Sequence, residues 1–198
     1  MQFDQGHLYH IYNRGNNSQV LFFERENYLF FLSKIRKYLH PLVDILAYCL
    51  MPNHFHLLIY VPEIASSKHS ECDSKSRPEL INKNIGIILS SYTRAINKKH
   101  GRTGSLFQSK TKAKNLSNPD YAFTCFHYIH QNPLSAGLVN LMEEWEFSSY
   151  KDYAGLRDGT LCKKVLAVEL LDTPIKPILF IEQSKGVKIE NEEKECLL

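Results

Sequence analysis

The sequence predicts an α+β fold with one antiparallel sheet, and three observations lead to this class. Short segments with strand-like alternation are separated by longer segments with helical periodicity. Two apolar segments on either side of Pro52-Asn53 lie close enough in the chain to pair as neighbouring strands. The chain has 198 residues, 43% of them hydrophobic, which is enough to bury one core. We therefore expect one core domain with appendages.

The first third of the chain predicts three strands and one helix. Residues 8–13 alternate apolar and polar side chains before a turn, which is typical of a strand. Residues 27–39 carry apolar side chains three and four positions apart, and the amphipathic helix that this predicts is ended by Pro41. Residues 43–50 and 54–61 predict the next two strands, joined by a tight connection.

The middle of the chain predicts an insertion, two helices and a fourth strand. Residues 62–78 are rich in serine and charge, and we expect a flexible insertion there. Helical periodicity resumes over residues 80–99, and residues 105–113 predict a short strand. A further helix is expected over residues 119–131, with an end near Gln131 because Pro133 disfavours helical geometry in the residue before it.

The order strand, helix, strand, strand, helix, strand is the split β-α-β arrangement of ferredoxin-like folds. We expect its helices on one face of the sheet and one added C-terminal helix, which carries Tyr128. Residues 1–158 are assigned to this domain, and residues 159–198 to a C-terminal extension. The tail after Pro174 is charged, and we expect it to be partly disordered.

Composition indicates a cytoplasmic protein. The N-terminus lacks the features of a signal peptide, and no apolar segment approaches the ~20 residues of a membrane span. Five scattered cysteines without a C-x-x-C pair argue against a disulfide framework and against a cysteine zinc site. We expect no membrane partner.

The charge is unevenly distributed along the chain. Residues 1–139 carry 16 Lys and Arg against 9 Asp and Glu, whereas residues 140–198 carry 8 against 12. Residues 80–119 contain eight basic side chains and no acidic one. Such a segment is often only a solvated face, but the lack of any carboxylate favours contact with a polyanion such as nucleic acid.

The chemically most informative segment is Met51-Pro52-Asn53-His54-Phe55-His56. In an extended strand, side chains two residues apart point to the same face, so His54 and His56 emerge side by side. This geometry suits a shared metal ion. The alternative is a pair of half-buried histidines hydrogen-bonded to backbone, and the segment alone does not decide between the two.

Tyr128 and Asn132 lie four residues apart on the expected last helix of the core domain and therefore share a face. If they face His54 and His56, the Asn132 carbonyl oxygen becomes a third ligand, and the metal keeps open positions for catalysis. The alternative is that Tyr128 is a core tyrosine, which periodicity alone favours.

Several segments resemble the histidine-hydrophobic-histidine (HUH) single-tyrosine transposases, especially the REP-associated tyrosine transposases. They follow one another in the family's order over residues 7–150: Tyr9-His10-Ile11-Tyr12-Asn13-Arg14-Gly15, Met51-Pro52-Asn53-His54-Phe55-His56, Gly104-Ser105-Leu106-Phe107-Gln108 and Tyr128-Ile129-His130-Gln131-Asn132-Pro133. The serine-rich insertion and the tail after Asp158 lie outside the resemblance.

The resemblance implies a transposase that cuts and rejoins single-stranded or hairpin DNA through a 5′-phosphotyrosine intermediate. Tyr128 is then the nucleophile, and His54 and His56 are ligands of a divalent metal ion, Mg²⁺ or Mn²⁺. Asn132 is the third ligand, with Gln131 as a less favoured substitute. A phenol with a pKa near ~10 is a poor nucleophile, so a metal ion on the phosphate would lower the barrier.

DNA is expected along the basic strand and the end of the basic helix. The side chains that we expect to contact phosphates are Arg14, Lys98, Arg102, Lys110 and Lys112, each with the alternative of being merely solvated. Two other functions stay open: a catalytically silent hairpin-binding protein of the same fold, and a metal-dependent hydrolase that uses water. The absence of further clustered Asp, Glu or His around the motif argues against the hydrolase. A homodimer is possible.

Overall fold

The computed structural model describes residues 1–63 and 76–189, and its centre is a sheet of four strands. These are β1 (Leu8–Arg14), β2 (Asp44–Met51), β3 (His54–Tyr60) and β4 (Lys112–Asn115). Their order is β2-β3-β1-β4, and each neighbouring pair is antiparallel. The α+β, ferredoxin-like fold predicted from the sequence is thereby confirmed.

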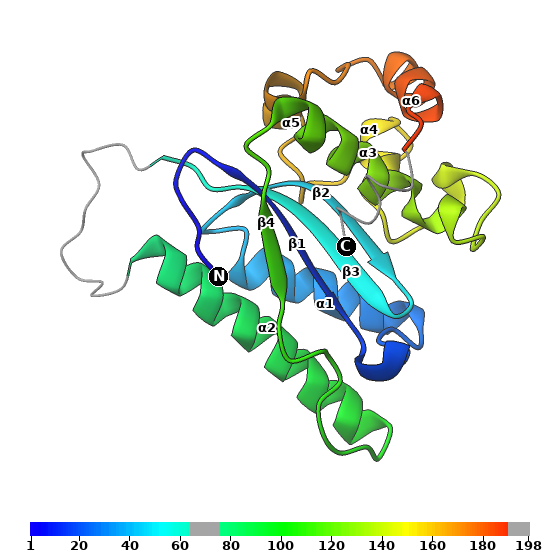
Figure 1. Cartoon of the computed structure of the whole chain (residues 1–198). Coiled ribbons are helices and arrows are strands. Elements are labelled where there is room, and N and C mark those ends of the chain that lie inside the picture. Colours follow the sequence, from blue (N-terminus) through cyan, green and yellow to red (C-terminus); the bar gives the residue numbers. More distant parts are fainter. Residues whose placement is uncertain (64–75, 190–198) are drawn as a thin grey trace.

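Two long helices, α1 (Arg25–Tyr38) and α2 (Arg77–Lys99), cover one face of the sheet (Figure 1). The aromatic rings of Phe31, Tyr92 and Phe107 pack against one another in this layer, with centroids 5.1 to 6.2 Å apart. All three side chains are buried. This face is therefore an apolar core, and the chemistry lies elsewhere.

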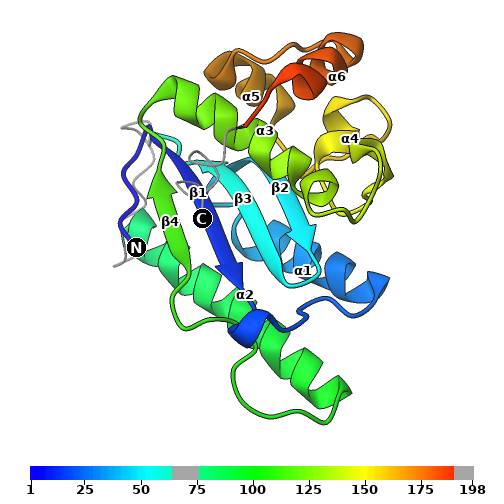
Figure 2. The same cartoon turned by 45° about the vertical axis from the view of Figure 1, so that its right-hand side comes forward.

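The opposite face carries α3 (Pro119–Ser135), the added helix (Figure 2). Asn118 caps it by accepting hydrogen bonds from the backbone N–H groups of Asp120 and Tyr121, as its sequence predicts. The helices α4 (Tyr150–Tyr153), α5 (Lys164–Leu171) and α6 (Pro177–Gly186) lie around α3 on the same side of the sheet (Figure 1). Two short 3-10 helices, η1 (Asn16–Ser18) and η2 (Met142–Glu144), complete the described elements.

The fourth strand is shorter than expected, because β4 begins only at Lys112. Phe107 makes an isolated bridge to Gly15, and the chain then leaves the sheet edge. There the side chain of Asn13 replaces backbone pairing by donating hydrogen bonds to the Gln108 carbonyl and to the Thr111 hydroxyl. The prediction of a strand over residues 105–113 is therefore wrong over most of its length.

The tyrosine helix is longer than expected, because α3 continues through Pro133 to Ser135. Pro133 lies in the last turn, where its missing N–H costs the helix one hydrogen bond near its end. Burial of Pro133 and the packing of α3 on the sheet outweigh that loss. The predicted end near Gln131 is thus wrong.

The C-terminal extension is helical where it is described. The ring of Phe180 in α6 is fully buried against Phe126 of α3, so the disorder expected after Pro174 does not include α6. Residues 190–198 lie outside the described residues, as do residues 64–75 of the expected insertion; its residues 77 and 78 belong to α2. Among the described helices, none has the length and apolar character that a transmembrane span requires.

Candidate functional site

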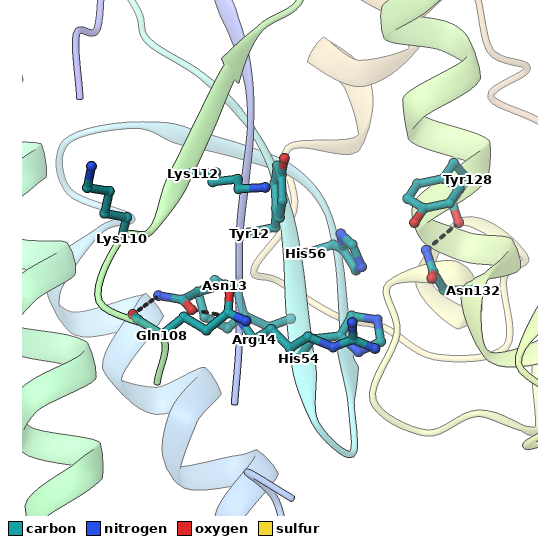
Figure 3. Close-up of a pocket in the computed structure, with 11 residues that line it drawn as sticks. Tyr12, Asn13, Arg14, His54, His56, Gln108, Lys110, Lys112, Tyr128 and Asn132 are labelled. Carbon is teal, nitrogen blue, oxygen red and sulfur yellow. Dashed lines mark hydrogen bonds between the residues drawn. The ribbon is translucent and has the colours of Figure 1, made fainter. Parts of the chain in front are cut away.

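A pocket of about 400 Å³ opens between α3 and the sheet (Figure 3). It is lined by Tyr12, Asn13, Arg14, His54, Phe55, His56, Gln108, Lys110, Lys112, Tyr128 and Asn132. Seven residues predicted as functional from the sequence are in this set: Arg14, His54, His56, Lys110, Lys112, Tyr128 and Asn132. The structure therefore brings both predicted histidines, the tyrosine and the asparagine to one place.

Strand register explains this convergence. On β1, Tyr12 pairs with His56 of β3 on one side and with Lys112 of β4 on the other. Arg14 pairs in the same way with His54. Paired residues of neighbouring strands point to the same face. The face below α3 thus carries a row of imidazole, phenol and ammonium groups across three strands.

His54 is half-buried, and its Nδ1 lies 2.6 Å from Oδ1 of Asn53. The amide nitrogen of Asn53 donates to the carbonyl of Ser18 at 3.3 Å, which fixes the orientation of the amide. Since Asn53 Oδ1 can only accept, Nδ1 of His54 carries the hydrogen. Its Nε2 then has a free lone pair, as a metal ligand requires.

His56 is fully buried, and its Nδ1 lies 2.9 Å from Nε2 of His10. Its Nε2 has no hydrogen-bond partner among the described residues, although a buried polar atom is normally satisfied. The rings of His54 and His56 meet edge to face, with centroids 4.9 Å apart. An unpartnered imidazole nitrogen beside a second imidazole fits a metal ion that the two would share.

Tyr128 and Asn132 reach the pocket from α3. The Tyr128 side chain is 7% exposed, and its ring stands edge to face with that of His56 at a centroid distance of 5.5 Å. Asn132 donates its amide N–H to the Tyr128 carbonyl at 2.8 Å (Figure 3). With the nitrogen engaged in this way, the amide oxygen Oδ1 is the Asn132 atom suited to a cation.

Burial sets the protonation of the site. Burial, and then the charge of Arg14, lower the pKa of His54 to about 4, while hydrogen bonding with Asn132 acts in the opposite direction. Burial also places the pKa of His56 well below its usual value. Both imidazoles are therefore neutral at pH 7, which metal binding requires. Burial raises the pKa of Tyr128 to about 12, against a smaller lowering from Asn132.

The donor atoms at the pocket are few and of two kinds. In the described part of the chain, no group of three or more His, Cys, Asp or Glu side chains could hold a metal ion. The available donors are two imidazole nitrogens and one amide oxygen, a set that leaves coordination positions open. Gln131, the less favoured substitute, instead donates to the carbonyls of Ser184 and Val187 near the end of α6.

Two of the five predicted phosphate contacts do not line the pocket. Lys98 lies in the last turn of α2, and Arg102 follows that helix and donates to Gln19 Oε1 at 2.5 Å. Because α2 covers the other face of the sheet, both belong to a different region (Figure 1). At the pocket, the Lys112 ammonium lies over the Tyr12 ring, 5.4 Å from its centroid.

Sequence reasoning did not predict four of the lining residues, Tyr12, Asn13, Phe55 and Gln108, or His10, which contacts His56. His10, Tyr12 and Arg14 lie two residues apart on one strand, so strand geometry predicts from the sequence that their side chains share a face. The contact between His10 and His56 was not readable, because it depends on the register between β1 and β3.

Comparisons with known proteins support the fold. No protein-family model and no curated protein sequence matches the chain. A solved structure described as a REP-associated tyrosine transposase bound to a REP hairpin aligns with a TM-score of 0.54 and 18% identity, over 82% of this chain and 94% of that one. A bacterial tRNA(His) guanylyltransferase-like protein in complex with GTP aligns with a TM-score of 0.41 and 12% identity, over 71% of each chain. At 18% identity, the first likeness shows a common fold.

Proposed function

We propose that this protein is a single-strand DNA nicking and joining enzyme related to the REP-associated tyrosine transposases. The observation that carries the proposal is the meeting of Tyr128 with His54 and His56 in one pocket. The neighbour of the same fold is a tyrosine transposase bound to hairpin DNA, which supports both the class of reaction and the class of substrate. Residues 1–158 would form the transposase domain and residues 159–198 an extension.

His54, His56 and Asn132 would hold a divalent metal ion, Mg²⁺ or Mn²⁺, through the two Nε2 atoms and the amide oxygen. When bound, the ion would neutralise charge on the scissile phosphate and orient it. Three protein donors leave room for phosphate oxygens in the octahedral coordination that both cations prefer. The neutral state of His54, whose pKa lies at about 4, keeps its lone pair available at pH 7.

Tyr128 would attack the phosphorus atom with its phenolic oxygen. A bond forms between this oxygen and phosphorus, and the bond from phosphorus to the 3′ oxygen breaks. The phenolic proton ends on the departing 3′ oxygen, so that a 5′-phosphotyrosine and a free 3′-hydroxyl result. Because burial raises the pKa of Tyr128 to about 12, the phenol is protonated before DNA binds, and nucleophilic attack depends on the bound phosphate and cation.

Arg14, Lys110 and Lys112 would bind the phosphates on either side of the scissile one. All three line the pocket and are exposed, so a strand can reach them without rearrangement of the core. Lys98 and Arg102 would contact a more distant part of a hairpin, if the DNA extends around the edge of the sheet. The homodimer stays a sequence-based prediction.

A second candidate is a protein that binds a DNA hairpin without cutting it. The low exposure of Tyr128, 7%, favours this candidate, because a nucleophile must meet its phosphate. The unpartnered Nε2 of His56 favours the enzyme, because His56 lines the pocket beside His54, where this nitrogen could bind a cation. The two candidates differ in one observable, a covalent link between protein and DNA.

The test is a denaturing gel with labelled single-stranded and hairpin DNA, with and without Mn²⁺. Wild type should give a band of protein-linked DNA only with the metal, and Tyr128→Phe should give none while its DNA affinity stays within about threefold. Tyr121→Phe, on the first turn of the same helix, is the matched control and should still form the link. Metal-independent links, or links in Tyr128→Phe, would overturn the assignment.

A further inference from the structure

We propose that His10 is a positioning residue, which holds His56 in the tautomer that leaves Nε2 free for the divalent cation. This inference rests on the proposed function and adds to it a residue outside the expected ligand set. The hydrogen bond between the buried imidazoles of His10 and His56 should raise the affinity of the pocket for the cation.

The contact is well defined. His10 of β1 pairs with Leu58 of β3, two residues beyond His56, so both imidazoles lie on the α3 face. Their rings are nearly parallel, at 18°, with centroids 5.1 Å apart, and Nε2 of His10 is 2.9 Å from Nδ1 of His56. Neither side chain is exposed. The ring of Tyr12 stacks on His10 at 4.8 Å, which restricts rotation of the His10 ring.

Two neutral imidazoles share one hydrogen in such a contact, and two arrangements are possible. In the first, His56 donates from Nδ1 to His10 Nε2, so that Nε2 of His56 has a free lone pair toward the pocket and His10 carries its hydrogen on Nδ1. In the second, His10 donates from Nε2, and the hydrogen of His56 moves to its own Nε2. Only the first arrangement allows His56 to bind a metal ion.

His10 makes the first arrangement possible because its Nε2 can accept the hydrogen of His56 Nδ1. The His10 hydrogen then lies on its own Nδ1, which has no hydrogen-bond partner among the described residues, and a cation bound at His56 Nε2 would offset that cost. Without an acceptor there, a buried N–H at Nδ1 would be left unpaired, and the hydrogen would favour Nε2, which faces the pocket. A ligand histidine normally donates its other N–H to a carboxylate, a carbonyl or water, and loss of that partner weakens metal binding about 10- to 100-fold.

The neighbouring ligand has an equivalent arrangement with a different partner. Asn53 Oδ1 accepts from Nδ1 of His54 at 2.6 Å, so both candidate ligands are held through Nδ1 and present Nε2. The partners differ in one respect. Asn53 Oδ1 can only accept, whereas His10 can accept or donate at Nε2, and the tautomer of His56 therefore depends on the identity of residue 10.

The experiment combines Mn²⁺ affinity, measured on the full chain by electron paramagnetic resonance without DNA, with the tautomer of His56, measured by ¹⁵N nuclear magnetic resonance. In wild type, His56 should carry its hydrogen on Nδ1. His10→Phe keeps a ring but removes the acceptor, and it should weaken Mn²⁺ binding about 10- to 100-fold. His10→Gln can place an amide oxygen near the lost Nε2, and it should restore the affinity to within about fivefold of wild type.

His127→Phe is the matched control, because it removes another buried histidine from the layer around α3. It should bind Mn²⁺ as wild type does. A wild-type His56 with its hydrogen on Nε2, or a folded His10→Phe protein with unchanged Mn²⁺ affinity, would overturn the inference. The tautomer measurement needs no variant, so it decides the matter even if His10→Phe does not fold. Wild type that binds Mn²⁺ without forming a DNA link would contradict the proposed function alone.

Discussion

Two of the protein's closely spaced histidine pairs, His54/His56 and His127/His130, are largely buried, and only the first of these two faces the pocket. His54 and His56 lie two residues apart on β3, while His127 and His130 lie three residues apart on α3. Three of the four side chains are fully buried, and burial lowers the pKa in both pairs. Sequence spacing and burial alone therefore do not distinguish them.

The surroundings of the two pairs differ. His130 donates to or accepts from Ser149 at 2.7 Å and packs edge to face on Phe126, and His127 contacts Ser184 of α6 at 3.2 Å. These contacts join α3 to α4 and α6 and enclose the pair in protein. The pair on β3 instead meets an open cavity lined by two tyrosines, three amide side chains and three cationic side chains. A buried histidine indicates chemistry only where its free nitrogen meets space and complementary groups.

The largest expected effect is a difference in Mn²⁺ affinity between variants of the two histidine pairs. His56→Ala should reduce Mn²⁺ affinity more than about 100-fold, because loss of a ligand exceeds the ~10- to 100-fold effect of losing its supporting partner. His127→Ala should leave the affinity unchanged within about twofold. Isothermal titration calorimetry measures both. A large loss of affinity in His127→Ala would remove the distinction between the pairs.

The second pair should instead affect stability. His130→Ala removes a buried ring and its hydrogen bond to Ser149, and the free energy of unfolding should fall by roughly 2–4 kcal/mol. Urea unfolding followed by circular dichroism measures this change. His54→Ala, at a half-buried position beside the cavity, is the comparison variant and should cost less than about 1 kcal/mol. Equal losses in the two variants would contradict the account.

Stability should also depend on pH through the enclosed pair. The pKa of His127 is lowered from 6.5 to about 4, chiefly by burial. Its contribution is present above pH 6.5 and is lost as the pH falls toward 4, because the unfolded chain takes up a proton that the folded chain does not. Between these two pH values, His127 alone should contribute a slope of about 1.4 kcal/mol per pH unit to the free energy of unfolding. Urea titrations from pH 7.5 to 5 should show a shallower slope for His127→Phe, and an unchanged slope would contradict this prediction.

The smallest expected effects concern the cations. Arg14→Ala and Lys112→Ala should each weaken binding of single-stranded DNA several-fold and reduce the salt slope by about 0.7. Lys98→Ala should have a smaller effect on a short strand, because Lys98 belongs to the helix layer on the other face. Fluorescence anisotropy at several salt concentrations measures both quantities. A larger effect at Lys98 would place the DNA along α2 rather than in the pocket.

Much of the fold was predictable because periodicity and turn residues act locally. The order of strands and helices up to Asn118 follows from such patterns. The errors arise where tertiary contacts determine the structure. Side-chain hydrogen bonds from Asn13 replace part of the expected fourth strand, and burial of Pro133 extends α3. The helix α6 forms because Phe180 is buried in the layer around α3, which its charged neighbours in the sequence do not indicate.

The candidate site was predictable in part for the same reason. His54 and His56 share a face by strand geometry, and Tyr128 and Asn132 share one by helix geometry. These two faces meet because α3 packs on the sheet. Only the resemblance to the transposase family predicted this packing from the sequence. His10 escaped prediction because its contact with His56 crosses two strands separated by more than forty residues of chain.

The pocket of His54 and His56 is proposed to bring a DNA phosphate to Tyr128. The most direct test is peptide mass spectrometry of wild type incubated with hairpin DNA and Mn²⁺, then treated with nuclease and protease. The account predicts a nucleotide attached to the peptide that contains Tyr128, and no attached nucleotide in His56→Ala. A nucleotide attached to another residue, or DNA cleaved with no protein-linked product, would contradict it.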